Sequence, residues 1–259
     1  MYQNYIFDLY GTLVDIHTNE QKRYLWEKMA LYMRLQGADY TAGELRKAYH
    51  AQIAAQRAEN LTAAQAALIS HNRRKNKVEE STAENILSEE IEVSFEKLIP
   101  ALYQAKGVEI SLQQAADWAI AFRTLSLEHL SLYEGAADLL KKLREHGKKV
   151  FLLSNAQRLF TEPEMRALGI YDCFDAVCYS SDIGFVKPSA HFYQKLLRTQ
   201  GLNPQDSVMV GNDDRADAWG AHDNGLDSIY IYTRQSPKAA GPLPVNCRTI
   251  CDISEVYND

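Results

Sequence analysis

The 259-residue chain has few cysteines and no long hydrophobic run. Its four cysteines are scattered without a Cys-x-x-Cys pair, and Cys247 and Cys251 have no second pair to complete a metal site. No apolar run approaches the ~20 residues of a transmembrane helix. Met1 to Tyr5 lead directly into a strand-like segment rather than a signal peptide. We therefore expect a cytoplasmic protein with free thiols and no membrane partner.

Positive charge is also in short supply. Lysine and arginine total 28 against 34 aspartates and glutamates, so the net charge is −6. This balance argues against a nucleic-acid partner. A hydrophobic content of 46% with 24% charged residues is typical of a globular protein. The length suffices for one large domain or for a domain that carries a sizeable insertion.

Residues 17–130 are predicted to form successive helices with almost no strand. Apolar residues such as Leu25, Met29 and Tyr32 recur there at helical spacing. Helix starts are expected at Thr41 with Glu44, at Ser81 with Glu84, and at Ser111.

From residue 131 onward, strands and helices are predicted to alternate. Such alternation favours an α/β fold with a doubly wound, parallel sheet and right-handed crossovers. The strand-like segment 5–10 is expected to join this sheet, so the core comprises residues 1–16 and 131–259, with the helical block 17–130 inserted after the first strand. The expected strands are 149–154, 176–179, 207–211 and 228–232, and the expected helices are 135–146, 163–168, 190–201 and 216–224.

Polar residues follow the predicted strands at the points where they end. Ligands of doubly wound sheets bind at the carboxyl ends of the strands, so these side chains are expected to face one crevice. Gly11 leaves the turn after the first strand open. The candidates are Asp8, Ser154, Asn155, Lys187, Asn212, Asp213, Asp214 and Asp217.

Together these residues resemble the four motifs of the haloacid dehalogenase (HAD) superfamily of hydrolases. Asp8 stands in the first motif, Ser154 in the second and Lys187 in the third, and Asp213 and Asp217 stand in the acidic fourth. The resemblance covers residues 5–19 and 130–232. It implies a Rossmann-like core, and it implies that the helical block is the type-1 cap, a lid over the active site.

The resemblance also implies a mechanism. Asp8 would be the nucleophile of a covalent hydrolysis. Mg²⁺ would be held by Asp8, the backbone carbonyl of Tyr10, and Asp213 or Asp217, because hard oxygen ligands suit this ion. The substrate would be a small phosphorylated metabolite. The residues implied to bind it are Thr12, Ser154, Asn155 and Lys187.

Tyr10 stands where phosphatases of this family usually carry a second aspartate as acid and base. A tyrosine with a pKa near ~10 is a poor base at neutral pH. The metal-independent 2-haloacid dehalogenases carry Asp-x-Tyr-Gly-Thr at this place, and Tyr193 also has their spacing from Lys187, although core packing explains an aromatic there equally well. Arg23 and Arg34 are the only candidates for the cap arginine of those enzymes.

The fourth motif favours the phosphatase. The dehalogenases show Ser-x-Asn-x-x-Asp there, whereas this chain has Asn212-x-Asp214-x-x-Asp217 with Asp213 in addition. Extra carboxylates would repel the carboxylate of a haloacid. A Mg²⁺-dependent phosphatase is therefore the main expectation, with a haloacid dehalogenase and a weakly active phospho-ligand-binding protein as alternatives.

Overall fold

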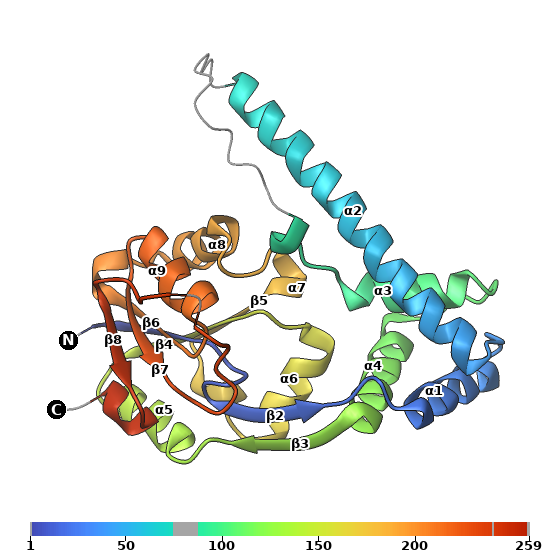
Figure 1. Cartoon of the computed structure of the whole chain (residues 1–259), viewed down its shortest axis with the longest axis horizontal. Coiled ribbons are helices and arrows are strands. Elements are labelled where there is room, and N and C mark those ends of the chain that lie inside the picture. The colour runs from blue at the N-terminus through green and yellow to red at the C-terminus, as the bar shows by residue number, and fades with distance from the viewer. Residues whose placement is uncertain (1, 75–87, 240, 258–259) are drawn as a thin grey trace. The chain divides into compact units, whose positions relative to one another are not determined.

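The computed structural model describes residues 2–74, 88–239 and 241–257 (Figure 1). The chain divides into two compact units. Unit 1 consists of Met1–Glu20 and Arg123–Asp259, and unit 2 consists of Gln21–Phe122. Unit 2 is therefore inserted into unit 1 after its first strands.

Unit 1 contains a six-stranded parallel sheet, as the alternating pattern predicts (Figure 1). The first strand lies in its middle, paired with β4 on one side and β6 on the other. The α/β fold class is confirmed, and so is the place of the first strand in the sheet. The strand order is β5 (Ala176–Tyr179), β4 (Lys149–Ser154), β1 (Asn4–Phe7), β6 (Ser207–Gly211), β7 (Asp227–Ile231) and β8 (Cys247–Ile250).

Helices cover both faces of the sheet, which explains why its strands are apolar on both sides. Tyr5 and Phe7 pack in one core cluster with the leucines of α5 (Ala136–Glu145). Ile6 points to the opposite face and packs with residues of α8 (Ala190–Gln200) and α9 (Gly220–Asp223). The central strands thus have almost no water-facing side chains.

Several elements differ from the sequence prediction. The helix expected over 163–168 is α6, Arg158–Ala167, which begins five residues earlier than expected and contains Pro163 in its interior. The helix expected over 216–224 begins as a π-helical turn, Asp214–Trp219, and ends as α9. The strand β8 was not predicted, because its four residues follow a loop rich in proline and glycine.

An antiparallel ribbon also escaped prediction. Its strands are β2 (Val14–Thr18) and β3 (Leu127–Leu132), in unit 1. The predicted boundaries after residues 16 and 130 fall inside these two strands, so the segment 17–130 is not wholly helical. Because both strands are short and only half buried, the alternation of apolar and polar residues that marks a strand is weak in their sequences.

Unit 2 is helical. Thr41 and Glu44 form the expected reciprocal cap, with Thr41 N 2.8 Å from Glu44 Oε2 and Glu44 N 3.3 Å from Thr41 Oγ1. Ser111 caps its helix in the same way with Gln114. The predicted pair Ser81 and Glu84 lies outside the described residues. The helices are α1 (Arg23–Leu35), α2 (Ala42–Arg74), α3 (Phe95–Gln104) and α4 (Leu112–Ser126), whose last residues belong to unit 1.

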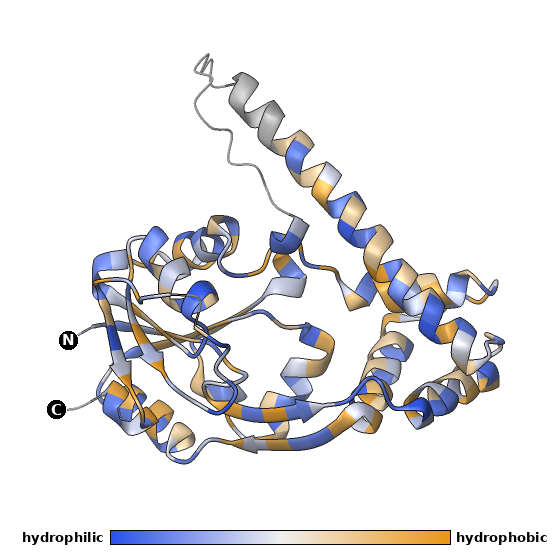
Figure 2. Ribbon diagram, viewed as in Figure 1, coloured by the Kyte–Doolittle hydropathy of each residue, from blue (hydrophilic) through white to orange (hydrophobic). Residues whose placement is uncertain are grey.

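Aromatic side chains form the core of unit 2. Trp118 stacks on Phe122 with ring centroids 5.0 Å apart, and Trp26 meets Phe122 edge-on. Among residues 42–67 of α2, whose burial the structure describes, only Leu45 and Tyr49 are buried, and the visible side of this helix mixes polar and apolar residues (Figure 2). Among the described residues, no helix is both long enough and apolar enough to cross a membrane.

Candidate active site

A cavity of about 220 Å³ opens at the carboxyl ends of β1, β4 and β6 in unit 1. The sequence predicted most of its polar residues, and the structure brings them together. It is lined by Asp8, Tyr10, Ser154, Asn155, Lys187, Asn212, Asp213, Ala216, Asp217, Gln235 and Pro237. Neither Thr12 nor Asp214 is among these residues, although both were candidates.

Asp8 follows the last residue of β1, and its amide donates a hydrogen bond to the carbonyl of Val210 on the neighbouring strand at 2.9 Å. The side chain of Thr12 lies behind it, fully buried, with Oγ1 3.4 Å from Asp8 Oδ2 and 3.3 Å from Asn212 Oδ1. Thr12 thus contacts the carboxylate rather than the cavity. Its role in substrate binding stays a prediction, and in this structure its hydroxyl lies against the Asp8 carboxylate.

Gly11 is required at the turn after Asp8. Its φ is +87°, which side chains rarely adopt, and a Cβ atom there would overlap the amide of Asn212. The close approach of two strand ends therefore depends on a residue without a side chain.

Lys187 is the central cation of the site. Its side chain is 2% exposed, and Nζ lies 2.6 Å from Asp8 Oδ1 and 2.7 Å from Asp217 Oδ1. Burial lowers the pKa of Lys187, but the carboxylates of Asp217 and Asp8 outweigh it, so the net shift is upward. Burial raises the pKa of Asp217 to about 7, opposed by Lys187. The ammonium therefore stays charged and neutralises part of a crowded acidic site.

The turn after β6 presents the acidic residues. Asp213 Oδ1 accepts a hydrogen bond from the amide of Ala216 at 2.7 Å, and Asp217 Oδ2 accepts one from the amide of Asp213 at 3.0 Å. A Cβ atom on Gly211 would overlap the Asp217 carboxylate. Tyr193 is fully buried and donates its hydroxyl to the carbonyl of Ala216 at 2.7 Å. In this protein Tyr193 therefore supports the turn from the core.

Ser154 is the last residue of β4, and Asn155 follows it. Ser154 is buried and lines the cavity. The Asn155 side chain pairs with the backbone of Lys187: its Oδ1 accepts from the Lys187 amide at 2.7 Å, and its Nδ2 donates to the Lys187 carbonyl at 3.1 Å. Besides facing the cavity, Asn155 therefore fixes the loop that carries the lysine.

The Tyr10 hydroxyl is engaged away from Asp8. It hydrogen-bonds to Glu164 and lies 3.0 Å from Thr161 Oγ1, both on α6. Glu164 in turn forms an ion pair with Arg123, with Nε 2.8 Å from Oε1. Burial, and then the Glu164 carboxylate, raises the pKa of Tyr10 well above its usual value. Tyr10 therefore stays neutral at physiological pH, and sequence reasoning missed both of its hydrogen-bond partners and the arginine that pairs with Glu164.

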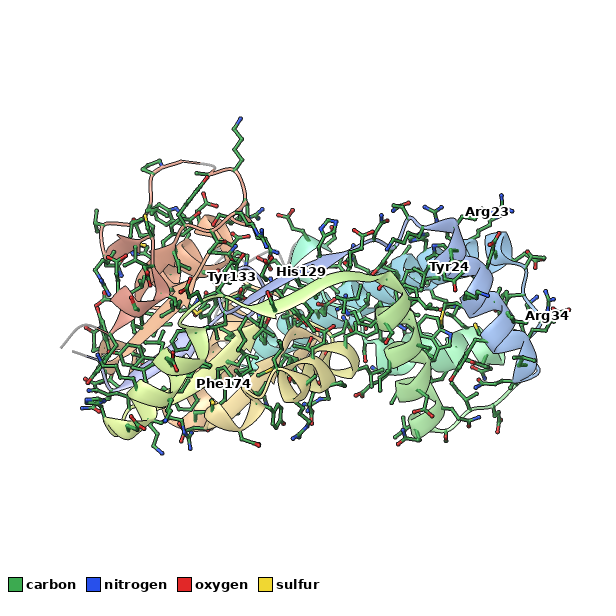
Figure 3. The ribbon with its side chains drawn as sticks, turned by 90° about the horizontal axis from the view of Figure 1, so that it is seen from below. Arg23, Tyr24, Arg34, His129, Tyr133 and Phe174 are labelled. Atoms are coloured by element: carbon green, nitrogen blue, oxygen red, sulfur yellow. The ribbon has the colours of Figure 1, made fainter. Side chains whose placement is uncertain are left out.

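We expect Tyr10→Phe to lower the free energy of unfolding by about 1–3 kcal/mol, because it leaves the buried Glu164 carboxylate without one donor. Urea unfolding monitored by circular dichroism measures the change. Tyr24→Phe is the matched control, since Tyr24 is 56% exposed on α1 (Figure 3). A Tyr10→Phe protein as stable as the control would show that the Tyr10–Glu164 bond contributes nothing.

The loop after β7 adds one wall of the cavity through Gln235 and Pro237. Thr233 Oγ1 donates to the carbonyl of Gly11 at 2.8 Å, in the turn that follows Asp8. Gln235 Nε2 is 2.6 Å from both Asp15 Oδ1 and the carbonyl of Ile16 on β2. The sequence gives little sign of this wall, because the loop resembles an ordinary surface turn.

The donor set of the cavity suits a small hard cation such as Mg²⁺, which binds through one or two carboxylates and otherwise through water and carbonyl oxygens. Asp8 and Asp213 both line the cavity. Both Asp217 oxygens are already engaged, one by Lys187 and the other by the Asp213 amide. In the described part of the chain, no three acidic, histidine or cysteine side chains form a metal-binding group. The fit therefore rests on two carboxylates rather than three.

Comparison with known proteins decides the family. The model of the haloacid dehalogenase-like hydrolase family matches residues 2–225. The chain belongs to this family. The expected family is confirmed, and the assignment of its four motifs to the residues around the cavity stays a prediction.

The curated relatives that match the chain include several phosphatases. A glyceraldehyde 3-phosphate phosphatase of Methanothermobacter thermautotrophicus is 30% identical over 43% of this chain and 50% of its own length. An N-acylneuraminate-9-phosphatase of Homo sapiens is 25% identical over 56% of this chain and 58% of its own. A phosphoserine phosphatase of Thermus thermophilus is 26% identical over 49% and 50%. The matches thus span about half the length of these relatives.

Solved structures with the same fold include both branches of the family. A HAD phosphatase from Thermococcus onnurineus matches with a TM-score of 0.55 and 14% identity, over 98% of this chain and 95% of that one. The L-2-haloacid dehalogenase RSc1362 matches with a TM-score of 0.51 and 17% identity, over 98% and 96%. At these identities the likeness shows the HAD fold, whatever the substrate.

Proposed function

We propose that this protein is a Mg²⁺-dependent phosphatase that hydrolyses a small phosphorylated metabolite through Asp8. The observation that carries the proposal is the cavity in which Lys187, Ser154 and Asp213 surround Asp8. A phosphate ester needs a nucleophile, donors for its non-bridging oxygens and compensation of its negative charge. The names of the relatives that match in sequence support the same reaction type.

In the first step, an Asp8 carboxylate oxygen attacks phosphorus and the bond to the leaving oxygen breaks. The leaving oxygen keeps the electron pair and takes a proton from solvent, since the Tyr10 hydroxyl is bound to Glu164. In the second step, water attacks the phosphorus of the aspartyl phosphate and the bond from phosphorus to the Asp8 oxygen breaks. Its electron pair restores the Asp8 carboxylate, and the released phosphate carries both protons of the water. Ser154 and Lys187 are placed to bind the non-bridging oxygens, and Asn155 positions Lys187.

Asp8, the carbonyl of Tyr10 and Asp213 are the proposed ligands of Mg²⁺. When bound, the ion would offset the repulsion between an anionic phosphate and the acidic site. Asp217, also a candidate ligand in the sequence, is proposed to act instead by holding Lys187 at 2.7 Å.

Dehalogenation remains the second candidate because of Tyr10, which replaces the usual aspartate. The arginines considered for binding a haloacid carboxylate are engaged within unit 2. Arg23 pairs with Glu27 at 2.6 Å and Arg34 with Asp39 at 2.9 Å, and both project from α1 (Figure 3). They offer no specific support for a haloacid substrate.

Metal removal separates the two reactions. We expect EDTA to abolish hydrolysis of phosphate esters and added Mg²⁺ to restore it, because the single positive charge of Lys187 cannot offset both the carboxylates and a bound phosphate. The purified protein should be tested on p-nitrophenyl phosphate and on 2-chloropropionate, each with EDTA and with excess Mg²⁺. Release of chloride in EDTA without phosphatase activity would establish the dehalogenase, whereas phosphate binding without any turnover would indicate a binding protein.

A further inference from the structure

We propose that Gln235, held by Asp15, determines specificity by accepting a hydrogen bond from a hydroxyl group of the phosphorylated substrate. This inference rests on the proposed phosphatase function and narrows its substrate class to hydroxylated phosphate esters. It places a specificity contact in unit 1 itself, on the loop after β7.

The amide of Gln235 has a defined orientation. Its two partners, Asp15 Oδ1 and the carbonyl of Ile16, are both acceptors 2.6 Å away, so the atom facing them must be the nitrogen. The carboxylate and the carbonyl belong to β2 and do not line the cavity, whereas Gln235 does. The nitrogen is therefore directed out of the cavity wall.

The amide oxygen is the remaining polar atom of this side chain. No described residue donates a hydrogen bond to Gln235 Oε1, although the side chain is half buried. A carboxamide oxygen on the wall of a phosphate-binding cavity has acceptor capacity and no charge. It suits a hydroxyl group and offers nothing to a second phosphate.

Asp15 is the residue that holds the loop in place. Its side chain is 8% exposed, it forms an ion pair with Arg234, and its Oδ2 lies 3.2 Å from Nε2 of His129 on β3 (Figure 3). Three contacts from one buried carboxylate leave the Gln235 amide little freedom to turn. Asp15 is thus a positioning residue, acting through Gln235.

The test compares two esters that differ in hydroxyl groups, glycerol 3-phosphate and propyl phosphate. Gln235→Met keeps the length of the side chain and removes the acceptor together with the amide nitrogen that bonds Asp15 and Ile16, so propyl phosphate reports any general effect of moving the loop. We expect it to lower kcat/KM for glycerol 3-phosphate by about three- to tenfold, mainly through KM, and to change that for propyl phosphate by less than about twofold. Lys238→Met, on the same loop but not lining the cavity, is the control and should retain the preference.

Asp15 is tested by a pair of variants. Asp15→Ala frees the Gln235 amide and should lose the preference for glycerol 3-phosphate, whereas Asp15→Asn keeps an acceptor at Oδ1 and should retain it. Equal losses on both esters in Gln235→Met would overturn the proposal. Calorimetric binding of the two esters gives the same comparison without turnover. A protein that hydrolyses neither ester nor p-nitrophenyl phosphate would refute the proposed function, while the binding preference would still decide the role of Gln235.

Discussion

Replacing Asp8 with asparagine is expected to reduce kcat for phosphate esters by roughly 10⁴-fold or more, because the amide cannot form the covalent intermediate. The substitution is nearly isosteric, and its Oδ1 can still accept the hydrogen bond that Lys187 Nζ donates at 2.6 Å. The loss should therefore appear in kcat, with substrate affinity far less affected. Initial rates with p-nitrophenyl phosphate in excess Mg²⁺ measure it.

The matched control is Asp172→Asn, which removes an exposed carboxylate from the surface of unit 1. It should retain full activity, and both variants should show the circular dichroism spectrum of the parent. Mass spectrometry of the acid-quenched parent protein should detect phosphorylated Asp8 during turnover. Asp8→Asn protein that hydrolyses esters within tenfold of the parent would disprove the nucleophile assignment.

Most of the cavity residues could be predicted because strand ends are visible in the sequence. Asp8, Ser154 and Asp213 each follow a short apolar run, and parallel strands bring such ends to one edge of a sheet. Lys187 lies in a loop between elements, and its place was predicted from its motif rather than from a strand. These predictions required no knowledge of side-chain orientation.

The contacts of Tyr10 could not be predicted, because they depend on the orientation of side chains in the folded protein. Glu164 and Thr161 lie more than 150 positions away on α6, and the proline in that helix concealed where it begins. Arg123 lies at the end of a helix whose sequence resembles the rest of unit 2. Gln235 was missed likewise, because only the tertiary contact with Asp15 gives its amide an orientation.

Removal of the Lys187 ammonium is expected to destabilise the protein strongly. Lys187→Met keeps the apolar stem but leaves the carboxylates of Asp8 and Asp217, whose side chains are 11% and 3% exposed, without their shared cation. Losing one partner of a buried ion pair costs about 3–5 kcal/mol. We expect this loss in the free energy of unfolding, measured with urea in EDTA. Lys195→Met, an exposed lysine on α8, is the control and should change stability by less than about 0.5 kcal/mol.

A second variant shows whether the loss comes from the unpaired carboxylates. Asp217→Asn alone should cost about 1–3 kcal/mol, because it weakens a buried charge-assisted hydrogen bond. The double variant Lys187→Met, Asp217→Asn lacks one of the two carboxylates that Lys187→Met leaves unpaired. Its loss in the free energy of unfolding should therefore be smaller than the sum of the two single losses by about 0.5–3 kcal/mol. Strictly additive losses would mean that Lys187 acts through packing alone.

The pH dependence of Lys187→Met follows from the same cation. Burial raises the pKa of Asp217 to about 7 from the 3.8 of an unfolded chain, so its protonated form is the better tolerated one inside the fold. An acid whose pKa is raised in the folded state stabilises the fold at pH values below its unfolded pKa. This stabilisation is lost as the pH rises through the folded pKa of about 7. Without the ammonium, protonation is the remaining way to remove the Asp217 charge. The deficit of Lys187→Met should therefore be larger at pH 8 than at pH 5, and a deficit independent of pH would argue against unpaired charge as its cause.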